Sequence, residues 1–553
     1  MFYVLQTLPG KGPPLTICAG FFTVKNDQKG DDLMSDRTVT AKGGKVAGNP
    51  PKDVKKPEPP SFMKRFGFPI ALIVLIAVLM LPTPAGLLPA GHRMLAVLLF
   101  AVVIWITEAV TYPVSATIIA SLMLLLLGTS PALEKAAAAA GKQIGFGQAI
   151  TMTFNGLSAG GTILVGAAMF LAAAMTTTGL DKRIALTILS KVGSKTNRIV
   201  AGMIFVGFVL AFFVPSTTAR VGCIIPIVLG IISAFGLPLQ SRFSALLMVA
   251  TIHAASIWNI GIKTAAAQNM VALGFIEKEL GGSITWLHWF IVAAPYAAVM
   301  SVVLFFLCIK LLPAEMSEVE GGDATVKKAM AELGPMRMPE KKLLAISLLL
   351  LLCWVTEKTV HPISTTASTV IAITLMFMPG IAIMTWKQAQ DRVSWGTLVL
   401  FGIGISMGSA LLKTKAAMWL ANKLVAVLGL ATMEVFAVFA ILAAFLIVVH
   451  LGFASATAVA SSMIPIMIAV LKSLNLSEGV VDGVNIIDVT MLLQFVVSFG
   501  FILPVNSPQG ILAYATETFT AKDCMKIGIP VTIIGYILLL VFAKTYWTVL
   551  GIF

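Results

Sequence analysis

Long apolar runs separated by short polar segments fill the chain after residue 65, for example 70–81 and 533–543. A membrane-spanning helix needs roughly 20 mostly apolar residues, and the alternation typical of barrel strands is absent. The pattern therefore predicts an all-α polytopic membrane protein with about eleven transmembrane helices. The expected spans are 67–84, 93–110, 113–128, 157–178, 242–275, 287–312, 342–357, 363–380, 395–412, 484–515 and 526–549.

Two further apolar stretches, 199–234 and 433–473, each contain a short polar turn. The first turn lies in Val214-Pro-Ser-Thr-Thr-Ala-Arg-Val-Gly-Cys-Ile-Ile-Pro-Ile227. The second lies in Phe453-Ala-Ser-Ala-Thr-Ala-Val-Ala-Ser-Ser-Met-Ile-Pro-Ile466, and the two segments align without a gap. Limbs of about 15 to 17 residues are short for a full crossing, so we expect two re-entrant hairpins.

A second duplicated segment extends this repeat. Trp105-Ile-Thr-Glu-Ala-Val-Thr-Tyr-Pro-Val-Ser115 aligns with Trp354-Val-Thr-Glu-Lys-Thr-Val-His-Pro-Ile-Ser364. Two markers at similar spacing, with the matching spans running in opposite directions, indicate inverted-topology repeats. The expected organisation is a tail at 1–65, a first repeat at 66–313, a linker at 314–341 and a second repeat at 342–553.

Composition supports a membrane protein and excludes a soluble one, because 58% of residues are hydrophobic and only 12% are charged. Lys and Arg gather in the tail, at 182–198 and at 327–342, which places the N-terminus and the linker in the cytoplasm. The net charge of +14 therefore reflects loop charges at the lipid bilayer, and no nucleic-acid partner is expected. The five scattered cysteines have no metal-ligand spacing, so we expect no metal, cofactor or disulfide.

The tail is rich in Lys, Gly, Pro and Asp and has no periodicity, which predicts a disordered cytoplasmic segment. No signal peptide is evident before the first long apolar run near Phe66. Met34 is a plausible alternative start, which leaves open whether residues 1–33 belong to the natural protein.

Helix-breaking residues interrupt two spans, one after each hairpin. The segments are Trp258-Asn-Ile-Gly-Ile-Lys-Thr-Ala-Ala-Ala-Gln-Asn269 and Leu503-Pro-Val-Asn-Ser-Pro-Gln-Gly510, and Gln268 matches Gln509. Irregular backbone at membrane depth survives only where it is buried in protein or lines a cavity. Freed N–H groups and helix N-termini favour anions. Two tips and two breaks therefore predict a site for a carboxylate substrate in a carrier.

Two basic residues beside this site carry the coupling hypothesis. A charge at membrane depth costs about 2.5–3.5 kcal/mol or more, and few acidic residues are near Arg220 or Lys263 in sequence. A transported anion would be their partner, and an empty site with fixed positive charge would resist crossing. We therefore expect obligate, sodium-independent anion exchange (antiport), with Na⁺-coupled symport as the alternative.

The ordered, duplicated motifs resemble the divalent anion:sodium symporter family of di- and tricarboxylate carriers, from about residue 67 to the C-terminus. The likeness includes 107–114 and 503–508, and Thr218-Ala219-Arg220 resembles the dicarboxylate exchangers of that family. The resemblance implies alternating access, dicarboxylate substrates and a homodimer. Malate, succinate, fumarate, 2-oxoglutarate, tartrate and citrate all stay open, and a bacterial inner membrane is the expected location.

The resemblance also assigns substrate contacts. They fall on the hairpin tips and the second break, and Arg220, Lys263 and Thr264 complete the candidate site. Thr217 and Ala456 stand where the family has Asn, and Ala265-Ala266-Ala267 replace a Thr-Pro-Pro, which counts against standard sodium coordination. The residues assigned by resemblance are Ser216, Thr217, Thr218, Ser455, Ala456, Thr457, Asn506 and Ser507.

Plainer interpretations stand beside these. Arg220 also fits a helix cap or the membrane interface, and Lys263 also fits a side chain that snorkels to the interface. His253 and His450 fit hydrogen-bonded helix residues better than proton carriers, and Glu108 and Glu357 fit matching helix ends. Gly404-Ile-Ser-Met-Gly408 matches a hydrolase motif, but it lies in an apolar span, where two glycines four residues apart favour close helix packing. An intramembrane enzyme is therefore a distant alternative, and a channel is another.

Overall fold

The structure is a computed structural model that describes residues 62–234, 236–318, 322–474 and 485–553. The tail expected at 1–65, with the open question of residues 1–33, lies outside the described residues except for 62–65, which belong to α1 (Phe62–Met80). The described residues form helices joined by loops and no named β-strand, so the all-α prediction is confirmed.

Nine helices of the described ranges are long and apolar enough to cross a membrane. Several of the eleven expected spans, such as α3 (Tyr112–Gly128) and α15 (Thr365–Phe377), fall below that length. The candidate spans are α1, α2 (Pro89–Thr107), α6 (Gly160–Thr178), α8 (Thr196–Phe213), α10 (Arg242–Gly261), α12 (Trp286–Leu311), α17 (Trp395–Lys413), α20 (Ala456–Ser473) and α23–α24 (Ala521–Lys544 and Tyr546–Val549).

The order of helices in the first half recurs in the second. Each half contains the same series of elements: a helix pair, a short helix, a span, a second short helix, a helical hairpin, a broken helix and a final span. The further pairs are α2 with α14 (Met338–Val355), α3 with α15, α5 (Phe146–Phe154) with α16 (Trp386–Gln390), α6 with α17, α7 (Leu180–Leu189) with α18 (Ala416–Leu428), and α12 with α23.

Both polar stretches fold as helical hairpins. The first pairs α8 with α9 (Thr217–Ala234), and the second pairs α19 (Val435–His450) with α20. Three of these limbs have 18 residues, slightly more than the 15 to 17 expected, and α19 has 16, which lies within that range. Length alone therefore leaves re-entrance a prediction.

Both helices expected to be broken are interrupted where the polar residues stand. α10 ends at Gly261, and a single 3₁₀ turn separates it from α11 (Ala267–Glu279). In the second half a longer irregular segment separates α21 (Ile486–Val496) from α22 (Pro508–Tyr514). Every residue of α10 from Phe243 to Gly261 is buried, so this helix lies in protein rather than against lipid.

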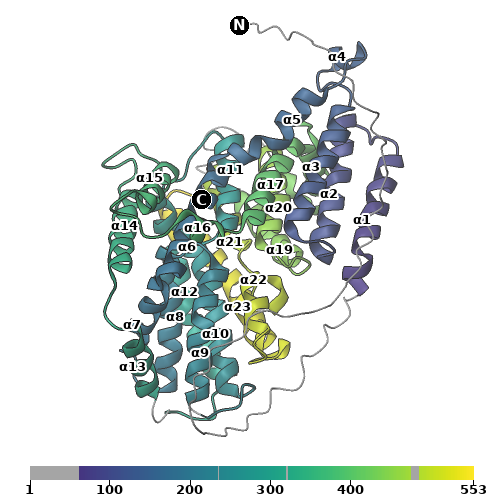
Figure 1. The fold of residues 1–553 in the computed structure, drawn as a ribbon. Helices are drawn as coiled ribbons and strands as arrows, with labels where there is room; N and C mark the ends of the chain where they lie inside the picture. Colours follow the sequence, from purple (N-terminus) through teal and green to yellow (C-terminus); the bar gives the residue numbers. More distant parts are fainter. Residues whose placement is uncertain (1–61, 235, 319–321, 475–484) are drawn as a thin grey trace, which may run out of the picture. The chain divides into compact units, whose positions relative to one another are not determined.

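The helices gather into groups around these broken segments. α8, α9 and α12 pack on α10, while α3 and α20 pack on α17 (Figure 1). The loop with α4 (Lys135–Ala139) lies at the opposite end of the molecule from α13 (Gly322–Leu333), and the sidedness of the two segments stays a prediction (Figure 1).

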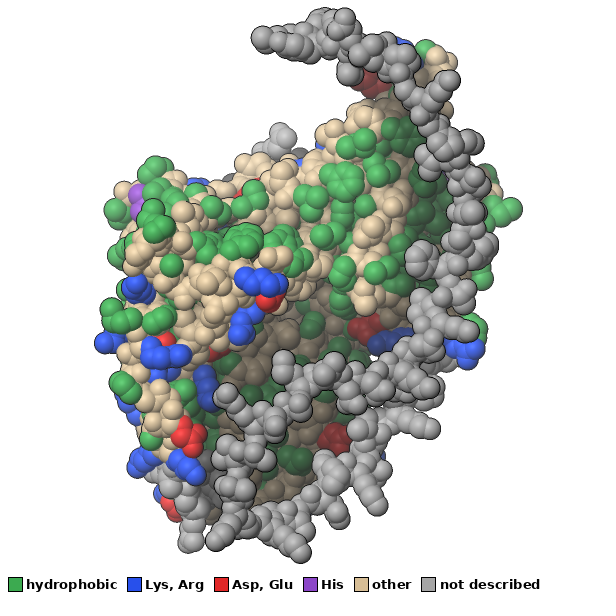
Figure 2. Space-filling model, in the orientation of Figure 1, with side chains coloured by type: hydrophobic (Ala, Val, Ile, Leu, Met, Phe, Trp, Pro, Cys, Tyr) green, Lys and Arg blue, Asp and Glu red, His purple; other side chains and the backbone are tan. Residues whose placement is uncertain are grey.

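The expected linker, 314–341, is not a simple connection. It contains α13, which packs on α7 and α9, and α14 begins inside it at Met338. Arg183 of α7 donates to the Glu340 carboxylate (Nε to Oε2, 2.7 Å), and Arg337 donates to the other oxygen (3.1 Å). Basic side chains gather over α7 and α13 (Figure 2). The two basic segments predicted to be cytoplasmic therefore touch each other.

Candidate binding cavity

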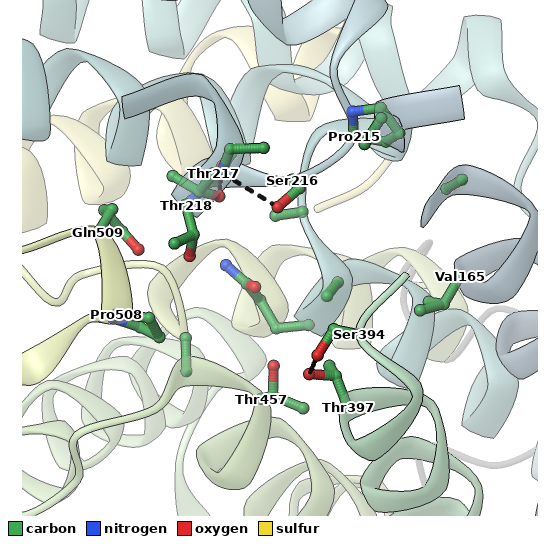
Figure 3. A pocket seen from close by; sticks show the side chains of 18 of the residues that line it. Val165, Pro215, Ser216, Thr217, Thr218, Ser394, Thr397, Thr457, Pro508 and Gln509 are labelled. Atoms are coloured by element: carbon green, nitrogen blue, oxygen red, sulfur yellow. Dashed lines mark hydrogen bonds between the residues drawn. The ribbon is translucent and has the colours of Figure 1, made fainter. Parts of the chain in front are cut away.

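A cavity of about 710 Å³ lies where the hairpin tips meet the broken helices. Thr218, Thr457 and Gln509 project into the same space from three helices (Figure 3). Nine of the eleven candidate residues line it, and Arg220 and Lys263 do not. The nine are Ser216, Thr217, Thr218, Thr264, Ser455, Ala456, Thr457, Asn506 and Ser507.

Four helices begin at this cavity. The first two residues of each helix line the wall, which aims the free N–H groups of their first turns into one space. Helix N-termini carry partial positive charge and bind anions. The four helices and their lining residues are α9 (Thr217, Thr218), α11 (Ala267, Gln268), α20 (Ala456, Thr457) and α22 (Pro508, Gln509).

The serines at these starts hold the helix ends. Ser216 accepts a hydrogen bond from the N–H of Ala219 (3.3 Å), and Ser455 accepts one from Ala458 (3.4 Å). Ser507 accepts likewise from Gly510 at 3.2 Å. The aligned Ser216 and Ser455 therefore both cap the start of a helix, one in each half, and both residues line the cavity wall.

An asparagine amide occupies carbonyl oxygens freed at the first break. Asn269 Nδ2 lies 2.7 to 3.3 Å from the carbonyl oxygens of Asn259, Ile262 and Lys263. Carbonyl clusters of this kind are where a coupling cation would bind. In this chain an amide group already satisfies them.

At the second break an asparagine amide again contacts three carbonyl oxygens, but these belong to the turn of the second hairpin. Asn506 Nδ2 lies 3.1 to 3.3 Å from the carbonyl oxygens of His450, Leu451 and Phe453. Its Oδ1 accepts from the N–H of Leu503 at 3.2 Å. Asn506 therefore ties the broken helix to the turn of the second hairpin.

Two glutamines cross between the halves. Gln268 Nε2 donates to Ser498 Oγ at 3.2 Å, and the matching Gln509 donates to Ser256 at 3.0 Å. All four residues line the cavity and are at least nine-tenths buried. Each half therefore supplies a glutamine to the other half, which the aligned glutamines alone do not show.

Arg220 lies behind the first tip, fully buried. Its Nη2 donates to the side chains of Thr217 (3.3 Å) and Asn259 and to the carbonyl of Ala255 (3.3 Å). Its Nε and Nη1 have no hydrogen-bond partner, and no carboxylate of the described ranges lies within 4 Å. Thr217 and Asn259 line the cavity and Arg220 does not, so direct substrate contact by the guanidinium stays a prediction.

Lys263 points away from the cavity. Its ammonium group donates to the carbonyl of Ile284 (2.7 Å) and to Thr365 Oγ1 (3.2 Å). Thr365 in turn donates to Glu357 (2.6 Å), whose carboxylate also accepts from the N–H of Trp286. The ammonium group thus has protein partners, and substrate contact by Lys263 stays a prediction. Glu357 holds helix ends, as expected.

The remaining polar residues singled out by sequence have structural partners. His253 contacts the carbonyl of Phe501 (Nε2 to O, 3.0 Å), and His450 contacts that of Asn506 (3.3 Å). Ser406 of the Gly404–Gly408 motif lies within α17 and accepts from the N–H of Gly156 at 2.9 Å. The motif lacks the strand–turn–helix setting that a nucleophile requires.

Sequence reasoning missed two charged residues of the cavity wall. Asp181 belongs to α7, and Arg392 belongs to the loop between α16 and α17. Both lie in segments that carry no span-length apolar signal. Asn259 was also missed, although an amide within the apolar run of α10 was a signal that could have found it.

Residues 63–553 match the family described as the sodium:sulfate symporter transmembrane region. A protein from Cupriavidus necator, described only as a membrane protein, is 49% identical over 492 residues, which are 89% of this chain and 94% of that protein. Inner membrane protein YbhI of Escherichia coli is 30% identical, covering 72% of this chain and 82% of its own.

A sodium-dependent dicarboxylate transporter, SdcS of Staphylococcus saprophyticus, is 27% identical, covering 86% of this chain and 89% of its own. Among solved structures, the YdaH transporter of Alcanivorax borkumensis superposes with a TM-score of 0.52 at 15% identity. That match covers 78% of this chain and 97% of the other, and it supports the fold alone.

Proposed function

Because the chain belongs to the sodium:sulfate symporter family, the divalent anion:sodium symporters, we propose that this multi-pass membrane transporter exchanges dicarboxylates by alternating access. The single observation that carries the proposal is the convergence of four helix N-termini and several hydroxyl groups on one cavity. These are neutral N–H and O–H donors, which suit carboxylate oxygens. SdcS, a relative over most of the chain, is described as a dicarboxylate transporter.

Exchange, rather than symport, rests on Arg220. A buried guanidinium with neutral partners is costly until an opposite charge is near. A dicarboxylate bound between the tips supplies that opposite charge. It acts on the guanidinium electrostatically, even without direct contact, because Thr217 and Asn259, which line the cavity, accept hydrogen bonds from Arg220. The loaded carrier then carries less uncompensated charge than the empty one, which favours movement only with substrate bound.

The amide groups at the breaks support the same proposal. Asn269 and Asn506 donate to carbonyl oxygens near the first break and at the second hairpin tip, which are the kind of oxygen that sodium would coordinate. Sodium binding there would have to displace those hydrogen bonds. Substrate contact is proposed for the nine lining candidates, while Arg220 acts from behind Thr217.

Membrane placement is part of the proposal. The hairpins are re-entrant, because their tips meet the interrupted middle of two other helices rather than a loop region. The N-terminus and linker face the cytoplasm, and the contact between α7 and the linker supports one shared side. A homodimer in a bacterial inner membrane is proposed, and the description of YbhI as an inner membrane protein supports that location.

Counterflow in proteoliposomes tests exchange. Vesicles loaded with unlabelled succinate should accumulate external radiolabelled succinate without sodium, and vesicles without internal substrate should not. Adding a sodium gradient should change neither result. Sodium-driven uptake into empty vesicles would overturn exchange.

The second candidate function is Na⁺-coupled symport of the same substrates. The description of SdcS as sodium-dependent favours it. In the same vesicles, this function requires uptake without internal substrate, in proportion to the sodium gradient. Large unitary currents from bilayers containing the protein would instead indicate a channel.

A further inference from the structure

We infer that Asp181 and Arg392 set the charge of the accepted substrate, favouring dianions over trianions such as citrate. The inference rests on the proposed function and names a narrower substrate class for the same cavity. Within the described ranges these two residues are the carboxylate and the guanidinium that line the cavity wall. Nothing in the sequence pattern joins them, since about 210 positions separate them.

Asp181 is fixed and buried. Its side chain and backbone are 2% exposed, and its Oδ1 accepts from the N–H of Lys182 at 2.7 Å. No cation of the described ranges lies within 4 Å of the carboxylate. Burial raises the pKa of this carboxyl above its ordinary value, while the Lys182 N–H and the Arg392 charge oppose that rise. α7 is not among the candidate membrane spans.

Arg392 is the second charged side chain of the cavity wall. It is exposed, and its guanidinium makes no hydrogen bond or ion pair within the described ranges. It lies two residues before Ser394, whose hydroxyl also lines the cavity (Figure 3). Its positive charge acts on Asp181 across the wall.

An acidic group in the wall of an anion site has a clear electrostatic consequence. A dicarboxylate is attracted by Arg392 and by the helix N-termini, and these offset repulsion by Asp181. A third carboxylate adds one more repulsive interaction without any further cation in the wall. Near the protein surface, one such repulsion over the width of the cavity is worth about tenfold in binding.

The experiment measures the ratio of citrate to succinate exchange in loaded proteoliposomes at neutral pH. Asp181→Asn should raise the citrate-to-succinate ratio of kcat/KM about tenfold, through a lower KM for citrate. Asp181→Glu, which keeps the charge, should leave the ratio near that of the wild type. Arg392→Gln removes the positive charge that offsets the repulsion by Asp181. It should therefore lower the citrate-to-succinate ratio and raise the KM for both substrates.

Asp391→Asn is the matched control, because Asp391 is exposed, pairs with Lys387 (2.7 Å) and does not line the cavity. It removes the same charge next to Arg392 and should leave the ratio unchanged. Succinate exchange with a ratio unmoved by either Asp181→Asn or Arg392→Gln would overturn the inference. A wild-type protein that exchanges neither substrate would instead count against the proposed function.

Discussion

Gln509 of the second half donates to Ser256 of the first half at 3.0 Å, across the pseudo-symmetric centre of the cavity. The aligned Gln268 returns the same contact to Ser498 at 3.2 Å. A contact exchanged in both directions fixes the spacing of the two broken helices. The cavity is therefore built jointly by the two halves.

Removing one member of this pair should couple to removing the other. Gln509→Ala and Ser256→Ala should each lower transition temperature and exchange rate, and the double variant should cost little more than one single variant, because only one hydrogen bond is lost. The expected coupling is about 0.5–1.5 kcal/mol. A double-mutant cycle on thermal unfolding in detergent measures it, and Gln268 with Ser498 provides the replicate. Strictly additive effects would show that the contact carries no energy.

Arg220→Gln should convert exchange partly into net transport. Without the buried cation, the empty carrier has no uncompensated charge to hold it back, so efflux into substrate-free medium should rise relative to exchange by about tenfold. The ratio of the two fluxes, measured in the same vesicles, is independent of the amount of folded protein.

Arg220→Lys should restore coupling, and Arg198→Gln, an exposed change on the first limb of the same hairpin, should not alter it. An unchanged flux ratio in Arg220→Gln would count against the charge mechanism.

Lys263→Met should lower stability while leaving the KM for substrate unchanged. The ammonium group donates to Ile284 and Thr365 and sits beside Glu357 rather than the cavity. Its loss leaves buried acceptors without a donor, at a cost of about 1–3 kcal/mol. Thermal unfolding and counterflow kinetics check the two halves of this prediction. The double variant Lys263→Met with Glu357→Gln should lose less stability than the sum of the two single losses. A raised KM for substrate in Lys263→Met would instead indicate that Lys263 contacts the substrate.

Asn506→Asp should destabilise the second hairpin and make the protein sodium-responsive. The substitution places a carboxylate oxygen among the carbonyl oxygens of His450, Leu451 and Phe453, where an amide now donates. A hard cation bound between these oxygens would relieve the repulsion. Unfolding temperature, measured with and without Na⁺, should rise with sodium in the variant but not in the wild type or in Asn197→Asp, an exposed change. Equal stability of variant and wild type in sodium-free buffer would contradict the prediction.

Glu315 should stabilise the start of α10 in a pH-dependent way. Partial burial acts to raise the pKa of Glu315, but the N–H groups of Arg242 (2.6 Å) and Phe243 (3.0 Å) hold it below its ordinary value of 4.5. The folded pKa is lower than the unfolded one, so the stabilisation is full above about pH 4.5 and is lost as the pH falls through the folded pKa.

Wild type should therefore unfold at a higher temperature than Glu315→Gln at pH 7, with the gap closing as the pH falls through the lowered pKa of the folded state. Glu332→Gln, an exposed change on α13, should show no gap at either pH. A gap that persists at low pH would assign the effect to packing.

Much of this site is readable from sequence because Pro, Ser and Gly interrupt apolar runs at the positions where helices must stop. Ser216 and Ser455 are found in this way, and so is the break at Asn506. These residues act through the local backbone, which sequence spacing determines directly.

Long side chains and short helices were harder to place. Lys263 was assigned to the cavity because it is a charge next to the predicted break, but its ammonium group donates to the carbonyl of Ile284 and to Thr365. Asp181 and Arg392 line the wall in a fold where α7 packs on α9 and α16 packs on α6. The linker helix α13 is short and amphipathic, so it carries no span signal. Such residues depend on tertiary packing, which periodicity does not encode.

The amides of Asn269 and Asn506 have a bioenergetic consequence. On the proposed exchange mechanism, in which these amides occupy carbonyl oxygens that a coupling ion would need, transport draws no work from an ion gradient. On the proposed exchange, net flux is set by the ratio of the two substrates on each side, and it reverses when that ratio reverses. Such a protein continues to balance metabolite pools in a cell that has lost its membrane potential, and it never concentrates one pool except at the expense of another.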